Sequence, residues 1–109
     1  MIKYSISKSY TETPGPRYES EGEFSGENFR KTVLINLVKE AKEKSEKIEL
    51  NLDGGYGYPT SFLEEAFGGL IRQLQDKSLT TMFVFISEEE PALIDEIKSY
   101  MIAASEVLK

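Results

Sequence analysis

Residues 48–74 read IELNLDGGYGYPTSFLEEAFGGLIRQL and contain a strand, a loop and a helix in succession. At 48–52 apolar residues alternate with polar ones, a period of two that is typical of a half-buried β-strand. Glycines, tyrosines and a proline fill 53–59, which indicates a turn-rich loop. From residue 63 apolar side chains recur at steps of three and four, which predicts an amphipathic helix. This strand followed by a helix favours an α/β fold.

The chain before this unit predicts another strand, a long loop and another helix. Apolar residues at 2, 4 and 6 alternate with polar ones, which indicates a strand. Residues 9–23 lose any period and contain the breaker Thr-Pro-Gly-Pro, so we expect a long loop, with a short second strand around 18–24. Ser25 has the character of a helix N-cap. The expected apolar face of the following five-turn helix is Phe29, Val33, Leu37 and Ala41, widened by Leu34 and Val38.

After the unit come one further strand and one further helix. The run MFVFI at 82–86 is continuously apolar, which predicts a central strand covered on both faces. The apolar face expected for the last helix is Leu93, Ile94, Ile97, Met101 and Ala104. Alternating strands and helices predict a mixed, mostly parallel sheet of about four strands packed with about three helices. With 109 residues, we expect a single domain spanning 1–109.

The composition excludes several classes of function. The chain has no His and no Cys, which removes the Ser-His-Asp triad, the Cys-His dyad and zinc sites that need these ligands. A formal net charge of −6 disfavours nucleic acid and anionic membranes as partners. No apolar stretch approaches the length of a membrane span, and the first residues lack the charged-then-apolar pattern of a signal peptide, so we expect none. We therefore expect a cytoplasmic protein that is not an enzyme and that needs no cofactor or metal.

Two blocks of the sequence resemble a known family. DGGYGYPTSFLEEAFGGLIR at 53–72 and FSGENFR at 24–30 are similar to the STAS-like family of small bacterial proteins and domains of unknown function. More distantly, they resemble STAS domains, which include the anti-sigma factor antagonists. The resemblance implies a STAS-like fold and a regulatory protein-interaction module, with a kinase-like ATPase or an anti-sigma-like factor as partner.

The same resemblance implies a phosphorylation site. STAS domains of the antagonist type carry Asp-Ser-Ser-Gly at the start of a helix, and the second Ser is phosphorylated. This alignment puts Ser61 at the phosphorylated position and Thr60 before it, while Pro59 and Phe62 stand where the pattern has Asp and Gly. Read from the residues alone, Ser61 and Glu64 have the spacing of a capping box, which is a purely structural role.

The loop and the helix after it are the expected docking surface. Tyr56 and Tyr58 lie on a loop rather than on a periodic face, and exposed aromatic residues are frequent interface anchors. Alternatively, Tyr58 folds back over the end of the sheet. Two adjacent glycines inside a helix are costly, so either a neighbouring element or a partner packs against them. The predicted partner-binding residues are Tyr56, Tyr58, Phe62, Glu65, Gly68, Gly69 and Arg72.

Arg17 and Arg30 are candidate anion-binding residues, because guanidinium groups bind carboxylates and phosphates. They support an alternative function, a small-anion or nucleotide sensor that binds its ligand at the loop 54–61. The glycines there lack the Lys that follows the glycines of a P-loop. We favour the protein-interaction module, with a protein partner or a second copy of the chain in a homodimer.

Overall fold

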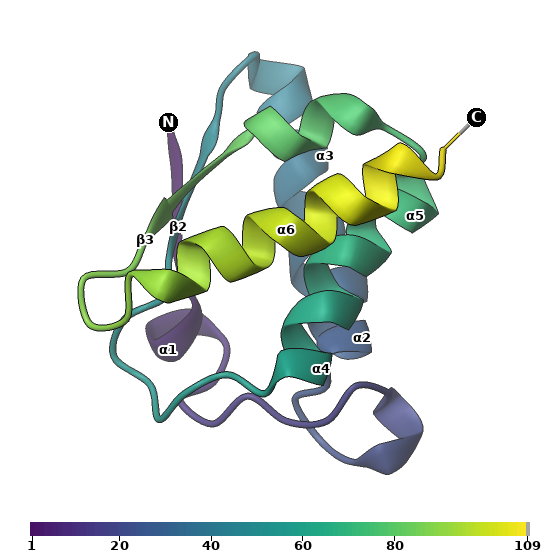
Figure 1. Ribbon diagram of the computed structural model, residues 1–109. Helices are drawn as coiled ribbons and strands as arrows, with labels where there is room; N and C mark the ends of the chain where they lie inside the picture. Colours follow the sequence, from purple (N-terminus) through teal and green to yellow (C-terminus); the bar gives the residue numbers. More distant parts are fainter. Residues whose placement is uncertain (109) are drawn as a thin grey trace.

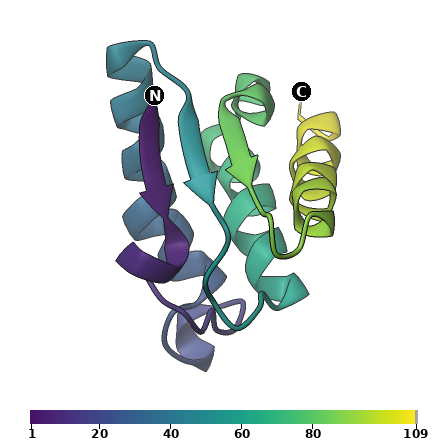
Figure 2. The same cartoon turned by 90° about the vertical axis from the view of Figure 1, so that its left-hand side faces the viewer.

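Three parallel strands, β1 (Ile2–Ser5), β2 (Ile48–Asn51) and β3 (Phe83–Ile86), form one sheet in the order β1–β2–β3. The computed structural model describes residues 1–108. The helices pack against one face of this sheet, and the other face is turned to the viewer in Figure 2. The register places Lys3, Glu49 and Val84 in one row across the sheet. The architecture is α/β, as the alternation of strands and helices predicts.

Two expectations about the sheet are wrong. Within residues 1–108 there is no fourth strand: 18–24 forms the single turn η1 (Glu19–Glu21), and Phe24 adopts a left-handed φ of 54° that interrupts extended backbone. The apolar run at 82–86 forms an edge strand, and β2 is central. Its composition misleads because only alternate residues, Phe83 and Phe85, are buried, whereas Val84 and Ile86 are half-exposed on the open face.

Two long helices cover one face of the sheet, and a third runs past the β3 edge and packs against the second of them (Figures 1 and 2). The first runs through α2 (Gly26–Phe29), η2 (Arg30–Leu34) and α3 (Ile35–Lys44), and the second through α4 (Thr60–Leu63), η3 (Glu64–Gly68) and α5 (Gly69–Leu74). The third is α6 (Ala92–Glu106). The short α1 (Ile6–Ser9) follows β1, and the single-turn η4 (Lys77–Thr81) precedes β3. Ser25 caps the first helix as predicted, its hydroxyl accepting the Asn28 N–H at 2.9 Å.

Both long helices contain a wide π turn, η2 in the first and η3 in the second. A π turn holds one more residue than an α turn and rotates the side chains that follow it. The buried face of the first helix therefore steps five residues from Phe29 to Leu34, and Val33 and Leu37 are only half-buried. The fully buried face is Phe29, Leu34, Val38 and Ala41.

Aromatic rings fill the space between the sheet and the two long helices. The ring of Phe29 lies 4.9 Å from that of Tyr10, 5.7 Å from that of Phe62 and 6.3 Å from that of Phe67. Phe67 in turn meets Phe85 of β3 edge to face at 5.6 Å. This cluster fixes the second helix, and with it the loop that leads into α4, against the sheet. No helix in the described part of the chain is long and apolar enough to cross a membrane.

Candidate functional site

The loop between β2 and α4 is held in place by its own backbone. The Tyr56 N–H donates to the Glu12 carbonyl at 2.9 Å, and the Gly54 N–H donates to the Glu89 carboxylate at 2.7 Å. Gly54 has a φ of 95°, and a Cβ there would lie 2.6 Å from the Ser7 hydroxyl, so this turn requires glycine. The loop is anchored to both neighbouring segments and has one defined shape.

Asp53 and Glu89 lock the loops that follow β2 and β3. The two carboxylate oxygens of Asp53 accept the N–H groups of Glu88 and Glu89, both at 3.0 Å. Glu89 returns a contact by accepting the Gly54 N–H. This lock was not predicted from the sequence. A signal was present, since Asp53 and the Glu-Glu-Glu run each follow a strand and the carboxyl ends of adjacent parallel strands lie at one edge of the sheet.

The two loop tyrosines have opposite environments. The Tyr56 side chain is 85% exposed, as the docking interpretation requires. Tyr58 folds back over the sheet end: its hydroxyl donates to the Leu52 carbonyl at 2.9 Å, and its ring lies 6.1 Å from that of Phe62. Burial raises the pKa of the Tyr58 phenol, and the nearby carboxylates of Asp53 and Glu89 raise it further.

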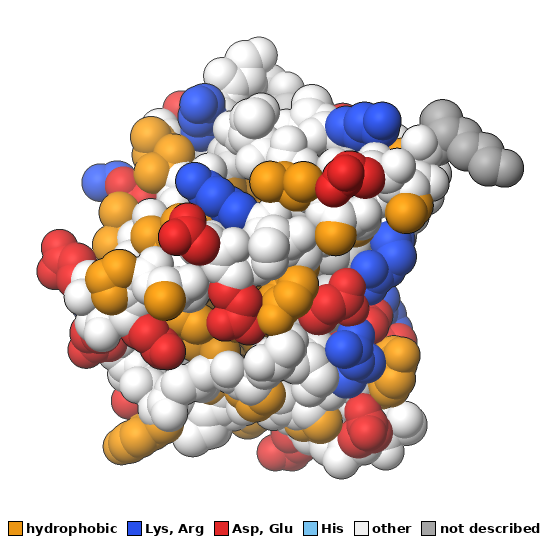
Figure 3. Space-filling model, in the orientation of Figure 1, with side chains coloured by type: hydrophobic (Ala, Val, Ile, Leu, Met, Phe, Trp, Pro, Cys, Tyr) orange, Lys and Arg blue, Asp and Glu red, His pale blue; other side chains and the backbone are white. Residues whose placement is uncertain are grey.

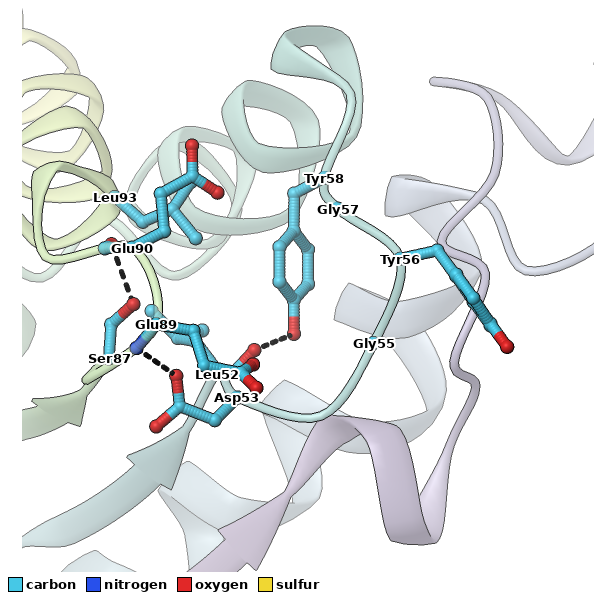
Figure 4. A pocket seen from close by; sticks show the side chains of 10 residues that line it. All are labelled: Leu52, Asp53, Gly55, Tyr56, Gly57, Tyr58, Ser87, Glu89, Glu90 and Leu93. Carbon is cyan, nitrogen blue, oxygen red and sulfur yellow. Dashed lines mark hydrogen bonds between the residues drawn. The ribbon is translucent and has the colours of Figure 1, made fainter.

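A cavity of about 260 Å³ lies beside Tyr58 at this edge of the sheet. In Figure 4 the Tyr58 ring stands on one side of it, the turn after β3 stands on the other, and the Tyr56 side chain points away. Figure 3 shows acidic side chains gathered at the left edge of the molecule, where that turn lies. The residues lining the cavity are Leu52, Asp53, Gly55, Tyr56, Gly57, Tyr58, Ser87, Glu89, Glu90 and Leu93.

The helix start differs from the predicted capping box. Pro59 is the N-cap residue and has no capping side chain, Thr60 is the first helical residue, and Ser61 lies inside the first turn. The capping-box prediction is wrong because Glu64 turns away from the helix end to bind Arg17 and Arg72. Thr60 is exposed and Ser61 is half-buried, so the two candidate phosphorylation residues differ in accessibility.

The candidate anion-binding arginines bind carboxylates of this chain. Arg17 contacts Glu64 at 2.7 Å and Glu65 at 3.3 Å, and Arg30 binds the other oxygen of Glu65 and its carbonyl. Arg72 completes the network on Glu64 at 2.7 Å. The guanidinium groups of Arg72 and Arg17 hold the pKa of the Glu64 carboxyl below its usual value. The charge of these arginines is therefore directed at the second helix rather than at the loop 54–61.

Acid should weaken the fold through Glu64. Its folded pKa is lowered, so the ionised form adds stability above the ordinary value of 4.5, and this stability is lost as pH falls through the folded pKa. We expect the free energy of unfolding, measured by urea denaturation, to fall more steeply below pH 4.5 in the wild type than in Glu64→Gln. Equal slopes for the two proteins would contradict this prediction.

The predicted docking residues divide into an exposed and an internal set. Phe62, Gly68 and Gly69 are buried, so they do not present a surface to a partner. A Cβ on Gly69 would lie 2.4 Å from the Arg30 guanidinium, so a neighbouring side chain of the same chain packs against this glycine. Arg72 is exposed and Glu65 is half-buried. Only the loop end of the predicted surface, at Tyr56, is an exposed aromatic site.

A family model described as a STAS-like domain of unknown function (DUF4325) matches residues 25–93, well over half of the chain. The chain belongs to this STAS-like family. The matched part of the STAS-like domain runs from the N-cap of the first helix to the start of α6 and includes the loop, the second helix and the acidic turn. No curated protein and no solved structure matches the chain. Among residues 1–108 of the STAS-like domain, no group of three acidic side chains is arranged to hold a metal ion.

Proposed function

We propose that this STAS-like domain is a non-catalytic regulatory module that binds a protein partner through the loop after β2. The observation that carries the proposal is the 85% exposure of the Tyr56 side chain on a loop whose backbone is fixed by hydrogen bonds to Glu12 and Glu89. A tyrosine buries a large area on binding and loses little conformational freedom, so a fixed, exposed tyrosine suits an interface anchor. In line with the resemblance to STAS domains, the partner is a kinase-like ATPase or an anti-sigma-like factor.

The regulatory step that we propose is phosphorylation at the start of α4. Thr60 is the better candidate by accessibility, since its side chain is exposed and Ser61 is half-buried. A phosphate there adds a charge of roughly −1.5 to −2 beside the docking loop. It would share a helix face with Glu64, one turn later, and would therefore compete for Arg17. Both the added charge and the loss of the contact between Arg17 and Glu64 would alter the surface that the partner binds.

Tyr56 gives the direct test of the docking surface. A photocrosslinking amino acid at position 56, introduced in cells that naturally make this protein, should give a covalent adduct with one partner protein. An adduct between two copies of this chain would identify a homodimer. The same crosslinking amino acid at Val107, which is 73% exposed and directly follows α6, should not give that adduct. With the partner purified, Tyr56→Ala should weaken binding by about 30-fold or more, as expected for an anchor residue. Unchanged binding would refute the proposal.

The same binding assay tests the switch. At whichever of the two residues is phosphorylated, the Glu variant (Thr60→Glu or Ser61→Glu) should weaken partner binding. The matched Ala variants should bind the partner as the wild type does. If the Glu and Ala variants bind the partner equally well at both positions, phosphorylation does not control this surface. The docking role of Tyr56 is then decided by the Tyr56→Ala measurement alone.

A further inference from the structure

We propose that the cavity beside Tyr58 receives an arginine side chain of the protein partner. This assignment rests on the proposed docking role of the loop and specifies the chemistry of the partner. The cavity lies at the carboxyl ends of β2 and β3, and the loop that carries the exposed Tyr56 lines one side of it. The Tyr56 side chain points away from the cavity, so a partner that reaches around both sides of this loop contacts Tyr56 and the cavity together. Its volume of about 260 Å³ lies below the roughly 300–1,000 Å³ of pockets for drug-sized ligands, which favours one side chain over a nucleotide.

The lining is acidic and contains no Lys or Arg. Asp53, Glu89 and Glu90 contribute carboxylates. The two oxygens of Asp53 and one oxygen of Glu89 are used by backbone N–H groups, which fixes their positions. Within residues 1–108, no hydrogen bond or ion pair engages the second oxygen of Glu89 or the carboxylate of Glu90, whose backbone carbonyl accepts the Ser87 hydroxyl. A cationic group in the cavity would therefore find fixed negative charge and free acceptor oxygens.

Tyr58 supplies the feature that distinguishes a guanidinium from other cations. Its ring forms the wall opposite the acidic turn in Figure 4, and the bond from its hydroxyl to the Leu52 carbonyl holds the ring in place. Arginine stacks on aromatic faces and binds carboxylates in a planar, two-pronged geometry, whereas the lysine ammonium is a strongly hydrated point charge. A guanidinium between Tyr58 and Glu90 can stack on the tyrosine ring and bind the carboxylate at the same time. Burial raises the pKa of the Tyr58 phenol, and the carboxylates of Asp53 and Glu89 raise it further, in agreement with the negative charge of the lining.

The lock between the two loops makes the cavity pre-organised. Asp53 and Glu89 join the loop after β2 to the turn after β3 through three hydrogen bonds. The walls therefore need little rearrangement when a side chain enters, and less of the binding free energy is lost to ordering. An acidic cavity of fixed shape also selects against partners that present a neutral or acidic side chain at this position.

The probe for this proposal is N-acetyl-arginine amide, with N-acetyl-citrulline amide as the neutral compound of the same shape. We expect saturable shifts of the backbone N–H signals of Gly54, Gly55 and Gly57 in NMR spectra with the arginine compound at millimolar concentration. Citrulline should bind about tenfold more weakly or worse, because it cannot form charge-assisted hydrogen bonds. Glu90→Gln should weaken arginine binding by a similar factor. Glu88→Gln is the matched control, because it removes the same charge from a neighbouring residue outside the lining, and it should leave arginine binding unchanged.

Each remaining outcome overturns the proposal. Equal binding of arginine and citrulline, equal effects of Glu90→Gln and Glu88→Gln, or no saturable shift would each show that the cavity does not select a guanidinium. The docking role is distinguished with the purified partner. If Tyr56→Ala weakens partner binding and Glu90→Gln does not, the surface is correct and the arginine assignment is wrong. If Tyr56→Ala has no effect, the proposed function itself fails.

Discussion

Phe29→Ala lowers the free energy of unfolding by about 3–5 kcal/mol, the largest loss that we expect from a single substitution in this chain. Phe29 has no solvent exposure, and its ring packs between Tyr10, Phe62 and Phe67. Truncation removes the contacts that join the first helix to the second and to the segment after β1. Since small domains are stable by only about 5–15 kcal/mol, the loss is a large share of the total. Urea denaturation followed by circular dichroism measures it.

Phe24→Ala is the matched control for this prediction. It makes the same chemical change, but the Phe24 ring is 40% exposed and has an edge contact with Tyr10 at 5.5 Å. The expected loss is below about 1 kcal/mol, as for most substitutions that create no buried cavity. If both variants lower the free energy of unfolding by the same amount, the aromatic cluster around Phe29 does not hold the two long helices and the segment after β1 together.

The fold follows from local periodicity except where packing changes the helix itself. The strands near residues 2–5, 48–51 and 83–86 and the three long helical segments are where the alternating and three-to-four patterns predict them. The π turns were not predictable in this way. The extra residue in η2 places Leu34 rather than Val33 on the buried face, and a periodic pattern that includes both residues cannot distinguish them. The edge position of β3 was not predictable, because a continuous apolar run does not show whether a strand has a neighbour on both of its edges or a helix on both of its faces.

The candidate site was predictable only in its local parts. The exposed loop and the following helix are both encoded within a short stretch, and the exposure of Tyr56 agrees with the prediction. The capping box failed because its Glu64 binds Arg17, which lies 47 residues away in the sequence. The acidic cavity likewise combines Asp53 with a turn 35 and 36 residues later. Contacts over such distances depend on the assembled sheet, so local periodicity does not indicate them. For Asp53 the available signal is the strand order, which brings the residues after two adjacent parallel strands to one edge of the sheet.

Gly26→Ala should lower the free energy of unfolding by about 2–3 kcal/mol, because a methyl group at position 26 forces apart the starts of the two long helices. A Cβ on Gly26 would lie 2.4 Å from the carbonyl oxygen of Phe62 and 3.1 Å from its Cα. These are backbone atoms in the first turns of the second helix, so they cannot move aside as a side chain can. Helix propensity alone favours alanine over glycine, so a loss of stability would identify the close contact as its cause. Urea denaturation of the variant measures the effect.

Gly68→Ala separates this packing effect from a general intolerance of alanine at buried glycines. A Cβ at position 68 would also meet an atom at short range, the carboxylate oxygen of Glu64 at 2.6 Å. That atom is the end of a flexible side chain, which can shift while it keeps one of its two arginine partners. The gain of about 1 kcal/mol in helix propensity offsets the disturbed ion pair, so the net change should stay within about 1 kcal/mol. Similar losses in both variants would mean that the approach of the two backbones at Gly26 does not decide how the helices pack.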